Sequence, residues 1–146
     1  MTKYFDRIYR TLRLVRYKQI FKNISEKQGS LSATEAFSVE IIYLLNNPTV
    51  NEFANYLSIS QPNASYKVNS LVNKGYLVKA ACLRDRREFK LKVTEKFRDY
   101  YGKKLPEWED AVNRVMARYT KDEVKLVKRF LLQVAAETQK LENQPV

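Results

Sequence analysis

Histidine is absent from the 146-residue sequence, and cysteine occurs once, as Cys82. Histidine is the commonest metal ligand and the usual general base near neutral pH, so its absence disfavours metal centres and many catalytic sites. A single cysteine forbids an internal disulfide. The sequence also shows no nucleophile–base pair, metal-ligand cluster or phosphate-binding loop. We therefore expect no metal, no cofactor and no enzyme activity.

Glycine and proline are scarce, with three and four residues respectively. So few chain-turning residues disfavour a loop-rich or all-β fold. No apolar run approaches the ~20 residues that a membrane-spanning helix needs. The first ten residues, MTKYFDRIYR, are charged where a secretory signal would be apolar. We expect a chain of one domain in the cytoplasm, with no membrane as a partner.

Acidic residues are outnumbered, with 16 Asp and Glu against 27 Lys and Arg, which gives a formal net charge of +11. Residues 1–28 and 60–92 each have a net charge of +6, whereas 29–59 have −3 and 93–146 have +2. A small domain this basic is typical of proteins that bind a polyanion, either nucleic acid or an anionic membrane. The second basic block mixes its cations with Asn, Ser and Gln, which favours nucleic acid.

Apolar residues recur with the helical period of 3.6 in six segments. Three of these segments open with a capping box, in which Ser or Thr is followed three residues later by Glu. The expected helices cover residues 4–28, 32–45, 49–57, 60–74, 94–119 with a kink at Pro106, and a last helix from 120 to a frayed end at 142–146. The segments 76–78 and 89–93 have the character of strands, and they bracket a charged tip at 83–87.

Residues 49–75 have the order of a helix-turn-helix, whose second helix places its N-terminal residues against base edges in the major groove. An apolar stripe at Ala64, Val68, Leu71 and Val72 turns the other face of this helix outward. Asn and Gln can bond adenine edges, and Ser can bond a base or a phosphate. The candidate DNA contacts on this helix are Gln61, Pro62, Asn63, Ser65, Tyr66, Lys67 and Ser70.

The hairpin tip provides a second candidate surface. Arg84, Arg86 and Arg87 lie beside Asp85, which can brace an arginine through a bidentate pair. A cationic tip next to a recognition helix can enter a minor groove, where the negative potential attracts arginine. We predict that these four residues form a wing that contacts DNA.

Together these motifs resemble the MarR/SlyA family of bacterial regulators, over about residues 31–95. The segment TVNEFANYLSIS at 49–60 is similar to the family's T-x-x-E-L-A-x-x-L-x-x-S pattern. Residues 85–87 resemble the wing motif D-x-R, and LKVTE at 91–95 resembles the closing L-T-E. The sequence departs from the residues usual in the family at Tyr66, Lys79, Cys82 and Phe97.

The resemblance implies a mainly α fold with a small β-hairpin wing. The winged helix-turn-helix domain, residues 31–95, would be flanked by dimerisation helices at 1–30 and 96–146. It also implies a homodimer that binds double-stranded DNA at a pseudo-palindromic operator, with half-sites roughly 34–36 Å apart. We interpret the chain as a sequence-specific transcriptional regulator that represses.

Members of the family often release DNA when a small lipophilic or phenolic ligand binds between the dimerisation helices and the winged domain. The residues that could line such a pocket here are Tyr17, Phe21, Phe37 and Ile41. Plain packing is the simpler interpretation of each of the four.

Two functions of other classes stay open. A less specific, architectural DNA- or RNA-binding protein would show a similar dependence on salt, and an enzyme ranks far lower. We interpret Cys82 as an inert strand cysteine rather than an oxidation sensor, although a nearby cation such as Arg84 could activate a thiol. Zinc sensing lacks the histidines it would need.

Overall fold

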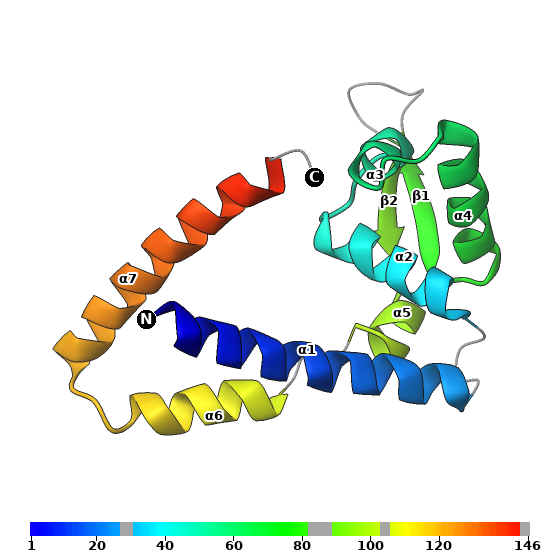
Figure 1. Ribbon diagram of the computed structural model, residues 1–146. Helices are drawn as coiled ribbons and strands as arrows, with labels where there is room; N and C mark the ends of the chain where they lie inside the picture. Colours follow the sequence, from blue (N-terminus) through cyan, green and yellow to red (C-terminus); the bar gives the residue numbers. More distant parts are fainter. Residues whose placement is uncertain (27–30, 82–88, 103–105, 144–146) are drawn as a thin grey trace. The chain divides into compact units, whose positions relative to one another are not determined.

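The computed structural model describes residues 1–26, 31–81, 89–102 and 106–143. It is mainly helical, with one antiparallel hairpin (Figure 1). The elements are α1 (Thr2–Ser25), α2 (Ala33–Leu44), α3 (Val50–Tyr56), α4 (Gln61–Asn73), β1 (Leu77–Ala81), β2 (Phe89–Val93), α5 (Glu95–Tyr100), α6 (Pro106–Met116), α7 (Lys121–Gln139) and the 3₁₀ turn η2 (Lys140–Asn143). The chain divides into two compact units, Met1–Lys103 and Lys104–Val146.

Capping boxes open three of the helices, as the sequence predicts. Ser32, Thr49 and Thr120 each accept a hydrogen bond from the backbone N–H of the glutamate three residues on, at 3.3, 3.1 and 3.3 Å. Each glutamate carboxylate accepts from the backbone N–H of its capping residue in return, at 2.9, 2.6 and 2.7 Å. The N-terminal boundaries of α2, α3 and α7 therefore follow from sequence signals four residues long.

The turn between α3 and α4 is tight. Ser58 has a φ of 53°, in the left-handed region that costs a side-chain-bearing residue roughly 1–2 kcal/mol. The next residue, Ile59, donates its backbone N–H to the carbonyl of Ala54 at 3.0 Å. Ser60 then caps α4 by accepting from the backbone N–H of Asn63 at 3.4 Å. These contacts fix the entry of the chain into α4.

The core of the first unit is built from apolar residues of every element in it. Val39 of α2, Phe53 of α3, Val68 of α4 and Leu91 of β2 have no exposed surface. Ile20 brings α1 into the same cluster. Burying a side chain of this size contributes roughly 1.5–3 kcal/mol. This cluster holds the helix-turn-helix against the hairpin.

The hairpin pairs β1 with β2 antiparallel, from Leu77 opposite Val93 to Ala81 opposite Phe89. The chain just before α3 adds to β2, because the N–H of Leu91 donates to the carbonyl of Pro48 at 2.8 Å. The hairpin is thus joined to the start of the helix-turn-helix. Strand β1 extends three residues past the predicted end at 78, since pairing with β2 continues through Lys79, Ala80 and Ala81.

The prediction of one kinked helix over 94–119 is wrong. Helix α5 ends at Tyr100, and α6 begins anew at Pro106. Phe97 and Tyr101 are buried in the core of the first unit. The backbone N–H of Gly102 donates to the carbonyl of Phe97 at 2.9 Å, at the end of α5. A Cβ on Gly102 would lie 2.9 Å from both the Arg98 Cα and the Phe97 ring, so only glycine fits there without a shift.

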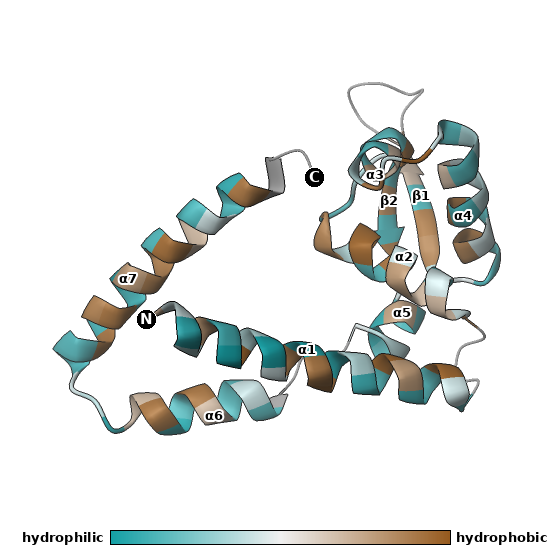
Figure 2. Cartoon of the chain, in the orientation of Figure 1, coloured by the Kyte–Doolittle hydropathy of each residue, from teal (hydrophilic) through white to brown (hydrophobic). Residues whose placement is uncertain are grey.

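The second unit contains α6, α7 and η2. No residue of α7 is buried, although apolar residues recur along it (Figure 2). Val127, Phe130 and Leu131 are 51%, 40% and 45% exposed. Helices of this kind owe most of their stability to packing of an apolar face. Within the described part of the chain, no helix combines the length and the apolar character that crossing a bilayer requires.

Candidate nucleic-acid interface

Helix α4 has one buried side and one exposed side. Ala64, Val68 and Leu71 are completely buried, as the predicted apolar stripe requires. The exposed residues of the helix are Gln61, Pro62, Asn63, Tyr66, Asn69 and Asn73. At 100° per residue, Pro62, Tyr66, Asn69 and Asn73 lie within about a quarter-turn of one another, opposite the stripe. We call the set Pro62, Asn63, Tyr66, Asn69 and Asn73 the outward face.

Three predicted contact residues lie at the edge of the outward face. Ser65 and Lys67 are half-buried. Ser70 is also half-buried, and its hydroxyl donates to Glu35 Oε1 of α2 at 2.7 Å. Ser70 therefore ties α4 to α2, and its side chain is directed at the protein rather than outward.

Asn69 belongs to the outward face and is not one of the contacts predicted from the sequence. Lys79 Nζ of β1 donates to Asn69 Oδ1 at 2.8 Å. This bond holds the amide of Asn69 and leaves its Nδ2 hydrogens to donate elsewhere. The signal was present in the sequence, since Asn69 follows Tyr66 by three residues and therefore shares its face. The tertiary partner Lys79 was not visible there.

The N-terminal end of α4 is tied to α3 by a side-chain bond. Gln61 Nε2 donates to Asn51 Oδ1 at 2.6 Å, and both residues are exposed. With the Ser60 cap, this bond orients the first turn of α4, where residues that contact base edges are placed in a helix-turn-helix. Gln61 is thus already engaged within the protein.

Glu35 joins α2 to α4 at the edge of this surface. Partial burial raises the pKa of its carboxyl, but hydrogen bonds from Lys74, from the Ser32 backbone and from Ser70 outweigh burial and lower the pKa to about 2. Lys74 Nζ lies 2.7 Å from Glu35 Oε2. The carboxylate is therefore ionised at all physiological pH values, and it holds α4 at two positions one turn apart.

Cations of the hairpin lie on both strands. Lys90 Nζ of β2 is 3.0 Å from Glu52 Oε2 of α3, and Lys79 and Lys92 are exposed. The backbone N–H of Thr49 and the Lys90 ammonium lower the pKa of Glu52. The predicted wing residues Arg84, Asp85, Arg86 and Arg87, together with Cys82, lie outside the described residues.

The predicted ligand-lining residues lie on α1 and α2. The Tyr17 and Phe37 rings meet edge to face, with centroids 6.0 Å apart. Phe21 is 56% exposed, and Ile41 is half-buried against the core. The ring contact brings together two of the four residues, Tyr17 and Phe37, and the ligand site stays a prediction. No set of three or more metal-ligating side chains is found in the described ranges.

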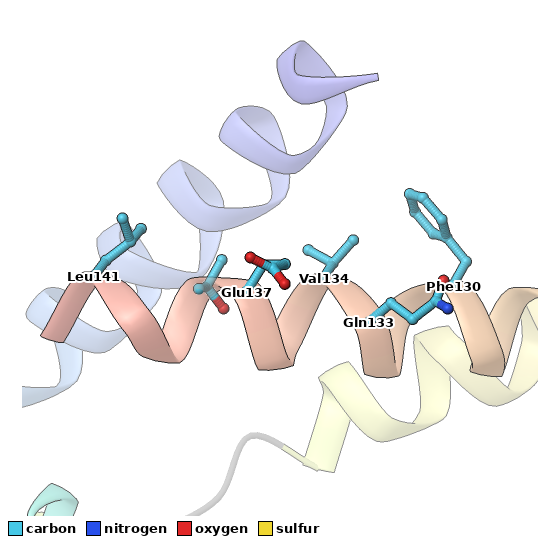
Figure 3. Close-up of a pocket in the computed structure, with 6 residues that line it drawn as sticks. Phe130, Gln133, Val134, Glu137 and Leu141 are labelled. Carbon is cyan, nitrogen blue, oxygen red and sulfur yellow. The ribbon is translucent and has the colours of Figure 1, made fainter. Parts of the chain in front are cut away.

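A separate hollow lies on the second unit. Its lining comes from α7 and η2: Phe130, Gln133, Val134, Glu137, Thr138 and Leu141. Phe130, Val134 and Leu141 project to the same side (Figure 3). The hollow therefore belongs to the apolar side of α7 and not to the helix-turn-helix.

The family model described as MarR family matches residues 41–88, which span α3, α4 and β1. No curated protein matches the chain. Transcriptional regulator Tm0710 from Thermotoga maritima is 17% identical, with a TM-score of 0.56, and the alignment covers 98% of this chain and 99% of that one.

Two other solved structures are similar in fold. FabT of Streptococcus pneumoniae, solved in complex with DNA, is 17% identical with a TM-score of 0.52, over 94% of this chain and 99% of that one. The MarR-like regulator tm0816 from Thermotoga maritima is 22% identical with a TM-score of 0.51, over 91% and 95%. At identities this low, the structural similarity shows the fold alone. Residues 41–88 therefore match the MarR family, and the chain shares the fold of solved MarR-like regulators, a mainly helical winged helix-turn-helix.

Proposed function

We propose that this protein is a transcriptional regulator that binds double-stranded DNA sequence-specifically, as a homodimer. The observation that carries the proposal is the outward face of α4. Its polar side chains are exposed, while the opposite side of the same helix is anchored in the core. Amide side chains at such positions can read base edges in a major groove. The net charge of +11 attracts the protein to DNA phosphates independently of the base sequence.

The similarity to FabT supports the same function, because that protein was solved in complex with DNA and shares the fold. A less specific, architectural binder would need the cations but not an ordered set of amides beside them. The bonds that hold Gln61 and Asn69 in place favour reading of sequence over binding of the backbone alone. The wing arginines would add contacts on the flanking minor groove.

A homodimer is proposed from the apolar side of α7. A 19-residue helix without a buried residue, carrying several large apolar side chains, is typical of a surface that a partner covers. A twofold dimer would present two α4 helices to two half-sites. Repression follows if the bound dimer blocks a promoter. Release of the DNA by a small ligand would act through the candidate pocket residues on α1 and α2, which are Tyr17, Phe21, Phe37 and Ile41.

The direct test is enrichment from a random duplex library with the full-length protein. We expect an inverted repeat whose half-sites are centred about 10 bp, one helical turn, apart. A reporter gene placed behind the enriched duplex should be expressed less when the protein is present. A library that shows no enrichment would contradict sequence-specific binding and favour the architectural alternative.

Asn63→Ala should relax the sequence preference at one base position in each half-site, by about 1–3 kcal/mol. Asn63 is exposed in the first turn of α4, and its side chain can pair with an adenine edge. Competition between duplexes that differ at single positions measures the effect. Asn113→Ala, at an exposed asparagine of α6, is the control and should leave the preference intact. If Asn63→Ala keeps the full preference, Asn63 is not a reader.

A further inference from the structure

Tyr66 is the most exposed large apolar side chain of the described residues, at 76%. It lies in the second turn of α4, on the outward face, and its neighbours there are small or polar: Pro62, Asn63, Asn69 and Asn73. An aromatic ring of this size in open solvent adds nothing to the core, because the buried stripe lies on the other side of the helix. The ring is therefore placed to contact something outside the protein.

The major groove offers one apolar group, the C5-methyl of thymine, and protein side chains contact it through apolar surface. On this basis we propose that the Tyr66 ring packs against a thymine methyl in each half-site, so that α4 selects thymine at that position. The proposal rests on the function proposed above and adds a specific chemistry to it. Cytosine and the purines present no methyl group there, so the ring discriminates against them.

The neighbours of Tyr66 support a groove contact over a contact with another protein. Asn63 precedes it by three residues and Asn69 follows it by three, so donors and acceptors flank the ring along the helix axis. Lys79 reaches the same place from β1 by bonding Asn69. A protein partner would cover these amides at the cost of their hydration, whereas base edges and phosphates can bond them.

The phenol hydroxyl of Tyr66 could instead bind a phosphate, and the same experiment distinguishes that role from the thymine contact. A hydroxyl that donates to a phosphate would anchor the helix without any preference for thymine. Tyr66→Phe removes the hydroxyl and keeps the ring, whereas Tyr66→Ala removes both. The thymine contact therefore predicts that phenylalanine behaves as tyrosine does, and the phosphate contact predicts that it behaves as alanine does.

The experiment uses the full-length protein and the duplex enriched from the random library. Each thymine of a half-site is replaced in turn by deoxyuridine, which lacks only the methyl group. At one position we expect the wild-type affinity to fall about fourfold, the value of one buried methyl group. Tyr66→Phe should show the same fall, and Tyr66→Ala should bind both duplexes equally. Tyr56→Ala, at an exposed tyrosine of α3, is the matched control and should keep the fall.

Three results would overturn the proposal. In the first, deoxyuridine lowers the wild-type affinity at none of the thymine positions. In the second, deoxyuridine lowers the affinity of Tyr66→Ala as much as that of the wild type. The third is loss of affinity in Tyr66→Phe equal to that in Tyr66→Ala, which would assign the hydroxyl to a phosphate. All three leave sequence-specific binding intact, because they presuppose an enriched duplex. Failure of the enrichment itself would remove the proposed function and this inference together.

Discussion

Replacing Val127 and Leu131 with glutamate should yield a monomer that binds the enriched duplex about 100-fold more weakly, or weaker still. Both residues lie on the apolar side of α7, where Val124, Val134 and Leu141 follow the same helical spacing. Two carboxylates there would have to lose water to be covered by a partner, which opposes association. A monomer occupies one half-site at a time, so the gain from linking two half-sites disappears.

The control for this prediction lies on the same helix. Leu132 is 72% exposed and points away from the apolar side, so Leu132→Glu should keep both the dimer and the affinity. Sedimentation equilibrium gives the mass, and titration with labelled duplex gives the affinity. No residue of α7 is buried within the chain, so the first unit should keep its helical circular dichroism. A double variant that stays dimeric would exclude this side of α7 as the interface.

Glu35→Ala should destabilise the protein by about 2–3 kcal/mol, because one carboxylate completes a helix cap and holds two residues of another helix. Its contacts with the Ser32 backbone, Ser70 and Lys74 would all be lost. Chemical denaturation at neutral pH measures the change. Glu123→Ala removes a matching capping box at the start of α7 and should cost less, since the contacts found for Glu123 lie within that box. Equal losses in the two variants would contradict a joining role for Glu35.

Glu35 also predicts how stability depends on acid. Its pKa is about 2 in the folded protein, against 4.5 when unperturbed. The unfolded chain therefore takes up the proton first as the pH falls. The stabilisation is fully present above about pH 5 and is lost as the pH falls from 4.5 towards 2. Glu35→Gln should flatten this part of the profile of unfolding free energy against pH. An unchanged slope would mean that other carboxylates cause the loss of stability in acid.

The parts of the fold that could be predicted rest on local signals. A capping box needs only two side chains three residues apart, so Ser32, Thr49 and Thr120 mark helix starts from sequence alone. The alternation FKLKV marks β2 for the same reason. The outward position of Tyr66 followed from the period of the buried stripe. Each of these depends on neighbours within about one turn or one strand.

The parts that were missed depend on residues distant in sequence. Glu35 was expected to cap a helix, but its bonds to Ser70 and Lys74 span 35 and 39 positions. The helical period places Asn69 on the face of Tyr66, but its bond to Lys79 on β1 cannot be inferred from that period. The break after α5 is set by burial of Phe97 and Tyr101 and by close packing at Gly102. The helical period of the sequence does not predict these tertiary contacts.

The central claim is that the outward face of α4 reads base sequence, and one affinity ratio tests it. The full-length protein is titrated at physiological salt with its enriched duplex and with a shuffled duplex of the same length and composition. Because phosphate contacts are equal in the two, the ratio isolates base readout. Specific regulators reach a ratio of about 10³ or more, and we expect that range here. A ratio near one would mean that the protein binds the DNA backbone only.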